Sequence, residues 1–145
     1  LDPVYLATSR VFDDEIKLKI NLHKSRRSSD WLKIEADTDL SEPLQALNTE
    51  QAVLIDCATM WLSNQMMDDA DLQKARTGLL MAVTECRAPV VIVSNEVGHG
   101  IVPDNALARR FREAQGRLNI SLAEQADLVV LVTAGLPQVL KGQLP

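Results

Sequence analysis

The chain has 145 residues, the size of one domain, and we predict a single domain over residues 1–145. Its hydrophobic content of 46% is enough for an ordinary core, and its net charge of −5 argues against broad binding to nucleic acid, which needs a basic surface. Cys57 and Cys86 show neither a disulfide framework nor metal-ligand spacing. Because no apolar run reaches membrane-spanning length and no signal-peptide pattern is present, we expect a cytoplasmic protein without a membrane span.

Four short apolar segments predict strands, at residues 3–9, 51–57, 89–95 and 127–135. They are rich in Val, Ile and Leu and do not alternate with polar residues, which is typical of strands buried on both faces of a parallel sheet. Helical patterns lie between them, over residues 13 to about 24, residues 72–86, a stretch capped by Asp104, and residues 118–126. The alternation predicts an open, mostly parallel α/β sheet with helices on both faces and right-handed crossovers.

Each predicted strand ends on small or polar residues: Thr8-Ser9, Asp56-Cys57, Ser94-Asn95-Glu96 and Thr133-Ala134-Gly135. For any one of them, a strand that stops where polarity begins is a sufficient explanation. Ligands of open α/β sheets bind at the carboxyl ends of the strands. Four polar ends together therefore favour a ligand site at this edge.

His23 has two interpretations from the residues alone. On the predicted helix it follows Ile16 and Ile20 on one face, which favours a packing residue. It also precedes the cations Lys24, Arg26 and Arg27, which suit a di- or triphosphate, although a helix terminus favours cations as well. A neutral imidazole can attack phosphorus, and neighbouring cations would stabilise departing pyrophosphate.

Three further features carry weaker signals. Asp56 follows four apolar residues, as a Walker B carboxylate that holds Mg²⁺ does, but a strand-end cap explains it equally well. Residues 95–100 predict a loop in which two glycines let the backbone approach a ligand. His99 in this loop could be a general base, but the prediction favours an exposed loop residue. Cys57 is predicted to be a buried structural residue, since nothing nearby in sequence would lower its pKa.

Several stretches together resemble a known family. They are Tyr5-Leu6-Ala7-Thr8-Ser9; Asp14-Glu15 with Ile20, His23, Arg27, Trp31 and Glu35; Leu54-Ile55-Asp56-Cys57 with Thr59, Trp61, Leu62 and Asn64; Ser94-Asn95-Glu96-Val97-Gly98 with Gly100-Ile101-Val102-Pro103; Arg109, Phe111 and Gly116-Arg117-Leu118-Asn119; and Gly135 with Lys141. In this order they are similar to the bifunctional adenosylcobinamide kinase / adenosylcobinamide-phosphate guanylyltransferases of cobalamin biosynthesis. The resemblance covers essentially the whole chain and implies the P-loop NTPase or RecA-like type of α/β sheet.

The resemblance implies two reactions. GTP or ATP phosphorylates adenosylcobinamide, and GTP then donates GMP to adenosylcobinamide phosphate through a guanylylated histidine. The family's histidine motif falls on His23. It implies nucleotide contacts at Thr8, Ser9, Arg10, Lys24, Ser25, Arg26, Arg27, Glu35 and Asp56, with Mg²⁺ near Asp56. It also implies a homotrimer.

The chain departs from the family pattern at its beginning. The family opens with a strand and a Gly-rich P-loop whose amides and lysine hold the phosphates, and the sequence before Pro3 contains neither. We interpret the sequence as a fragment. The alternatives are a degenerate, non-catalytic nucleotide- or corrinoid-binding domain, and a kinase of another small molecule, which would not need His23.

Overall fold

The computed structural model describes residues 1–10, 18–19, 21–22 and 30–145. The predicted helix over residues 13–24 lies mostly outside the described residues, and its described positions, 18–19 and 21–22, are helical. His23, Lys24, Ser25, Arg26 and Arg27 also lie outside them. Two compact units follow one another along the chain, Leu1–Asn95 and Glu96–Pro145.

The first unit is built on a four-stranded parallel sheet. Its strand order is β2-β1-β3-β4, with β1 at Asp2–Ala7, β2 at Leu32–Glu35, β3 at Gln51–Asp56 and β4 at Val90–Val93. The predicted open, parallel α/β sheet is therefore confirmed, and three of the four predicted strands belong to it. The strand β2 was not predicted.

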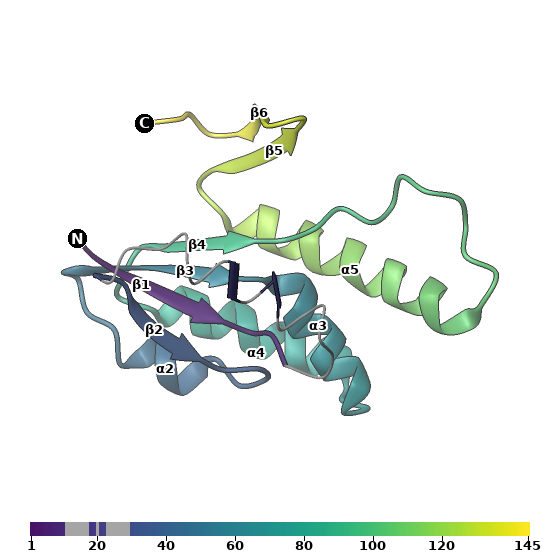
Figure 1. The fold of residues 1–145 in the computed structure, drawn as a ribbon, viewed down its shortest axis with the longest axis horizontal. Coiled ribbons are helices and arrows are strands. Elements are labelled where there is room, and N and C mark those ends of the chain that lie inside the picture. The colour runs from purple at the N-terminus through teal and green to yellow at the C-terminus, as the bar shows by residue number, and fades with distance from the viewer. Residues whose placement is uncertain (11–17, 20, 23–29) are drawn as a thin grey trace. The chain divides into compact units, whose positions relative to one another are not determined.

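Three helices pack on one face of this sheet, as Figure 1 shows: α2 (Ser41–Gln45), α3 (Ala58–Met67) and α4 (Leu72–Glu85). The predicted helix over residues 72–86 is confirmed as α4, whose first turn is capped by Asp71. The core lies between the sheet and the helices, where the largest fully buried side chains include Leu6, Ile55 and Trp61. Burial of this apolar surface holds the sheet and the helices together.

In the second unit one long helix, α5 (Ala106–Gln125), stands where two helices were predicted. Asn105 rather than Asp104 caps it, because the Asn105 side chain accepts a hydrogen bond from the Ala108 N–H at 2.7 Å. The helix continues through Gly116, since one interior glycine costs only about 1 kcal/mol relative to alanine.

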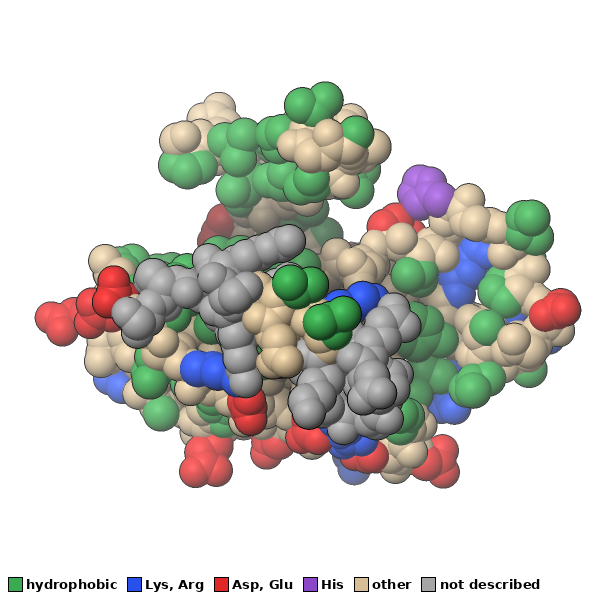
Figure 2. All heavy atoms as spheres, in the orientation of Figure 1, with side chains coloured by type: hydrophobic (Ala, Val, Ile, Leu, Met, Phe, Trp, Pro, Cys, Tyr) green, Lys and Arg blue, Asp and Glu red, His purple; other side chains and the backbone are tan. Residues whose placement is uncertain are grey.

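The strands β5 (Val129–Thr133) and β6 (Leu136–Lys141) form a separate antiparallel hairpin. Ala134 and Gly135 join them with φ of 53° and 74°, the two positive values that a type I′ turn requires. The prediction that residues 127–135 add a strand to the parallel sheet is therefore wrong, because the turn returns the chain to pair with itself. Figure 2 shows hydrophobic side chains on this hairpin. Val132 and Leu136 are both exposed. Among the described residues, no helix is both long and apolar enough to cross a membrane.

Candidate functional site at the carboxyl edge of the sheet

Hydrogen bonds join the polar ends of three parallel strands. The hydroxyl of Thr8, after β1, donates to the carbonyl of Cys57 at 2.7 Å and accepts from the Cys57 N–H at 2.9 Å. The N–H of Asn95, after β4, donates to the Thr59 hydroxyl at 2.9 Å. The predicted convergence of Thr8, Asp56-Cys57 and Asn95 is thus present within the first unit. The fourth predicted end, at Thr133 to Gly135, forms the turn of the separate hairpin instead.

Asp56, the last residue of β3, is held by an aromatic pair. The Tyr5 hydroxyl donates a hydrogen bond of 2.5 Å to Asp56 Oδ2. The Tyr5 ring meets Trp31 edge-on, with ring centroids 6.4 Å apart and an interplanar angle of 77°. An edge-to-face pair of this kind restricts both rings. The arrangement fixes the direction in which the Asp56 carboxylate points.

Cys57, the residue after β3, has a structural role. Its side chain is buried and its sulfur accepts a hydrogen bond from the Met60 N–H at 3.4 Å, so that it caps α3. Burial raises the pKa of the Cys57 thiol above its ordinary value, which disfavours the thiolate that a nucleophile would need. The prediction of a buried structural cysteine is confirmed.

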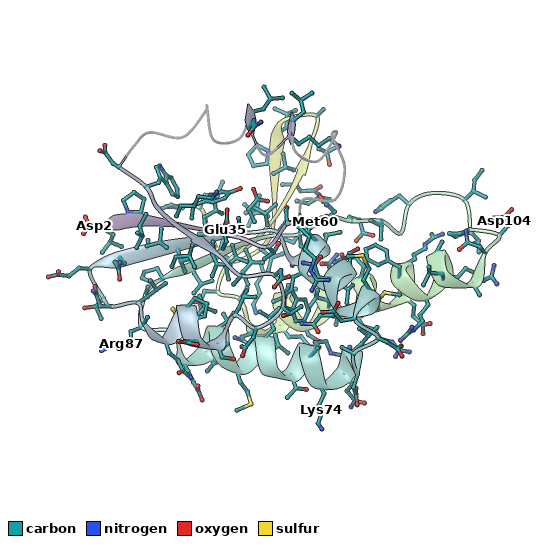
Figure 3. The ribbon with its side chains drawn as sticks, turned by 60° about the horizontal axis from the view of Figure 1, so that its bottom comes forward. Asp2, Glu35, Met60, Lys74, Arg87 and Asp104 are labelled. Carbon is teal, nitrogen blue, oxygen red and sulfur yellow. The ribbon has the colours of Figure 1, made fainter. Side chains whose placement is uncertain are left out.

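Glu35 ends β2 beside an acidic hollow. Figure 3 shows Glu35 and Met60 toward the carboxyl ends of the strands and Asp2 at the opposite end of the sheet. Glu35 pairs with Lys33 at 2.6 Å. The hollow has a volume of about 460 Å³ and is lined by Glu35, Ala36, Asp37, Thr38, Asp39, Glu42, Pro43 and Ala46. Four carboxyl-bearing side chains repel phosphate, so this hollow suits a group that donates hydrogen bonds.

Arg10 lies two residues beyond Thr8 and binds two carboxylates. Its Nε donates to Asp37 at 2.6 Å, and its two terminal nitrogens donate to the two Asp68 oxygens at 2.9 and 2.8 Å. The hydrogen bonds to Asp68 and then to Asp37 raise the pKa of Arg10 further above its ordinary value. The same bonds from Arg10 hold the pKa of Asp68 below its usual range. All three guanidinium nitrogens are therefore engaged within the protein.

Side chains of α3 position the loops, a role that the sequence did not predict although Trp61 and Asn64 belong to the family resemblance. The buried Asn64 donates through Nδ2 to the carbonyls of Thr8 at 2.7 Å and Asp37 at 2.9 Å. Trp61 and Gln65 both donate to the carbonyl of Thr38, at 2.7 and 3.0 Å. Residues spaced i, i+3 and i+4 share one helix face. A tryptophan and two amides at this spacing directly after a strand are the signal that could have found them.

The loop after β4 begins the second unit, and side chains of α5 hold it. Arg109 donates to the carbonyl of Pro103 at 2.8 Å, and Arg112 donates to the carbonyl of Gly98. The Glu96 carboxylate accepts the Gly98 N–H at 2.7 Å. His99 is exposed, as predicted. The loop carries polar groups, and two arginines fix its backbone.

A parallel α/β sheet whose polar strand ends are tied together at one edge defines the class of α/β proteins that bind ligands at that edge. Residues 1–140 match the family described as cobinamide kinase / cobinamide phosphate guanyltransferase, and the chain belongs to this family.

Curated relatives agree with the family match. The chain is 36% identical to the bifunctional adenosylcobalamin biosynthesis protein CobU of Escherichia coli, with 92% of this chain and 82% of the relative covered. It is 38% identical to CobU of Salmonella typhimurium over the same shares. It is 34% identical to the bifunctional adenosylcobalamin biosynthesis protein CobP of Pseudomonas aeruginosa, with 96% and 82% covered. The resemblance found in the sequence is confirmed.

Proposed function

We propose that this protein is a transferase of cobalamin biosynthesis with two activities. A nucleoside triphosphate, GTP or ATP, phosphorylates adenosylcobinamide, and GTP then donates GMP to adenosylcobinamide phosphate. The products of the second reaction are adenosylcobinamide-GDP and pyrophosphate. Membership of the family over residues 1–140 is the observation that carries the proposal. The convergence of three polar strand ends supports it by supplying a ligand edge.

The second reaction passes through a covalent guanylyl-histidine intermediate. A ring nitrogen of His23 attacks the α-phosphorus of GTP, and the bond to the bridging oxygen of the β-phosphate breaks to release pyrophosphate. Lys24, Ser25, Arg26 and Arg27 bind the phosphates and stabilise that leaving group. An oxygen of adenosylcobinamide phosphate then attacks the guanylyl phosphorus, the P–N bond breaks, and His23 is restored.

Among the described residues, we propose that Ser9, Glu35 and Asp56 contact the nucleotide and that Thr8 positions Ser9. The Thr8 hydroxyl already makes two hydrogen bonds to Cys57, which supports a positioning role. Glu35 borders the acidic hollow, where its carboxylate would accept hydrogen bonds from hydroxyl or base N–H groups.

Asp56 is the residue that would hold Mg²⁺. The described residues contain no group of three or more His, Cys, Asp or Glu side chains that could hold a metal. A single carboxylate fits Mg²⁺ nevertheless, because this ion usually takes one or two carboxylates together with phosphate oxygens and waters. When bound, Mg²⁺ neutralises charge on the phosphates. Tyr5 would keep the Asp56 carboxylate aimed at it.

By resemblance to the family, we also propose that the protein acts as a homotrimer in the cytoplasm. Size-exclusion chromatography with light scattering would measure the subunit number.

The guanylyl-histidine step is tested by labelling. The full-length protein is incubated with GTP labelled at its α-phosphate and then denatured. We expect label that is lost in acid and kept in base, as a P–N bond to histidine requires, and His23→Ala should abolish it. The matched control is His99→Ala, which removes the other histidine of the chain, an exposed loop residue.

Label that persists in His23→Ala, or that His99→Ala removes instead, would contradict the assignment. A wild-type protein that takes no label but binds GTP would favour a non-catalytic nucleotide-binding domain. A wild-type protein that takes no label but phosphorylates a small molecule would favour a kinase alone.

A further inference from the structure

We infer that Arg10 is a positioning residue, a guanidinium clamp that fixes the spacing between the segments after β1 and β2, and that it does not itself bind the nucleotide phosphates. The inference rests on the proposed function in one respect only, namely that the residues positioned by the clamp contact the nucleotide. The resemblance to the family implied a nucleotide contact at Arg10, and its observed partners point to a different role.

The clamp joins three segments that are distant in sequence. Arg10 belongs to the segment after β1, Asp37 to the segment after β2, and Asp68 is the C-cap of α3. The bonds from the terminal nitrogens to Asp68 are bidentate, the arrangement in which an arginine–carboxylate pair is strongest and most directional. Nε reaches Asp37 from the remaining edge of the same guanidinium. One planar group thus sets three backbone positions at once.

The clamp lies near the protein surface, so the geometry of its three hydrogen bonds, and not burial, distinguishes it from an ordinary surface ion pair. The Arg10 side chain is 27% exposed, and its partners Asp37 and Asp68 are 48% and 49% exposed. A phosphate that displaced both carboxylates would leave two anions close to a third, which Coulomb repulsion opposes. The guanidinium is therefore better placed to order the loops than to receive an anionic ligand.

The amide of Asn64 braces the same two segments. Its Nδ2 donates to the carbonyls of Thr8 and Asp37, so the loops are tied to α3 through the backbone as well. The residues held in place are neighbours of the proposed nucleotide contacts: Ser9 lies between Thr8 and Arg10, and Glu35 lies two positions before Asp37. The clamp controls the distance between Ser9 and Glu35, which one nucleotide would have to span. It also fixes the point from which the chain continues toward His23.

A double-mutant cycle separates the clamp from a phosphate ligand. Arg10→Gln, Asp68→Asn and the double variant are compared with wild type for the GTP concentration that half-saturates labelling and for the maximal labelling rate. A clamp predicts that Asp68→Asn changes both quantities in the same direction as Arg10→Gln but by less, because the bond from Nε to Asp37 remains. It also predicts that the double variant is no worse than Arg10→Gln alone. A phosphate ligand predicts that only Arg10→Gln raises the half-saturating concentration. Glu113→Gln is the matched control, because it removes the exposed Arg117–Glu113 pair on α5.

A second measurement does not depend on any activity. Hydrogen exchange of the nucleotide-free protein reports on residues 36–39, which are distant in sequence from Arg10. A clamp predicts that Arg10→Gln and Asp68→Asn both speed exchange there by up to about fivefold. Unchanged exchange at residues 36–39, or additive effects in the cycle, would overturn the inference. If the wild-type protein takes no label, the proposed function fails, and the exchange measurement still decides for or against the clamp.

Discussion

The two units of the chain hold their loops in opposite ways. In Leu1–Asn95 the loops at the strand ends are tied by side chains that are themselves buried, such as Thr8, Trp61 and Asn64. In Glu96–Pro145, a range that the structure describes completely, only Gln115 and Leu118 are buried. There Arg109, which is exposed, and Arg112, which is half-buried, hold the loop from α5 instead. Removing a buried hydrogen bond is costly because its partner stays buried and unsatisfied. Water can take the place of the lost group in an exposed hydrogen bond.

This contrast indicates which unit holds its loops in a defined geometry. The first unit contains most of the buried side chains of the described residues and also the candidate nucleotide contacts. A substitution there should therefore affect both stability and ligand geometry. The second unit should tolerate loss of its ties with small, local effects. Three substitutions test the contrast, in order of decreasing effect.

The largest loss is expected from Trp61→Ala in α3. Trp61 is 2% exposed and is the largest of the fully buried side chains. Its removal leaves a cavity and takes the hydrogen bond away from the Thr38 carbonyl. We expect the free energy of unfolding to fall by about 4 kcal/mol, measured by chemical denaturation. Met67→Ala, at an exposed position of the same helix, is the control and should change it by less than about 0.5 kcal/mol.

A smaller loss is expected from Asn64→Leu. This change keeps the side chain similar in size but removes the donors to two backbone carbonyls, so stability should fall by about 2 kcal/mol. Asn64→Asp should be no better than Asn64→Leu, because a carboxylate facing two carbonyls repels them. A stability of Asn64→Asp close to wild type would show that the amide donors do not matter.

The smallest loss is expected in the second unit, from Asn105→Ala. Its exposed side chain caps α5, and loss of such a cap costs about 1 kcal/mol. Asn105→Asp should keep the cap. Asp104→Ala, which removes the cap predicted from the sequence, should be neutral. The contrast between the units fails if Asn105→Ala is as damaging as Trp61→Ala.

The sequence was sufficient to predict three strands of the parallel sheet and α4, because continuous Val/Ile/Leu runs and a helical stripe are local patterns. It was not sufficient for β2, whose four residues Leu32–Glu35 include two charged ones and are ordered by pairing with β1. The helix α3 was missed because its cap is the sulfur of Cys57, and cysteine is not among the preferred capping residues. The hairpin was missed because Ala134 takes a positive φ that alanine rarely adopts.

The same division applies to the site. The polar ends at Thr8, Asp56 and Asn95 were predicted to meet because parallel strands share one carboxyl edge. The partners of Arg10 were not predictable, since Asp37 and Asp68 lie 27 and 58 positions further along the chain. The resemblance to the family implied a nucleotide contact at Arg10. Only its tertiary neighbours indicate a clamp.

The edge-on contact between Tyr5 and Trp31 gives the protein a natural optical probe. The chain has two tryptophans, of which Trp61 is buried in the core and Trp31 is half-buried against Tyr5. In Trp61→Phe, all tryptophan emission would come from Trp31, which follows residues 23–29 along the chain and contacts the partner of Asp56. Fluorescence of that variant would record nucleotide arrival at the carboxyl edge in real time without any attached dye.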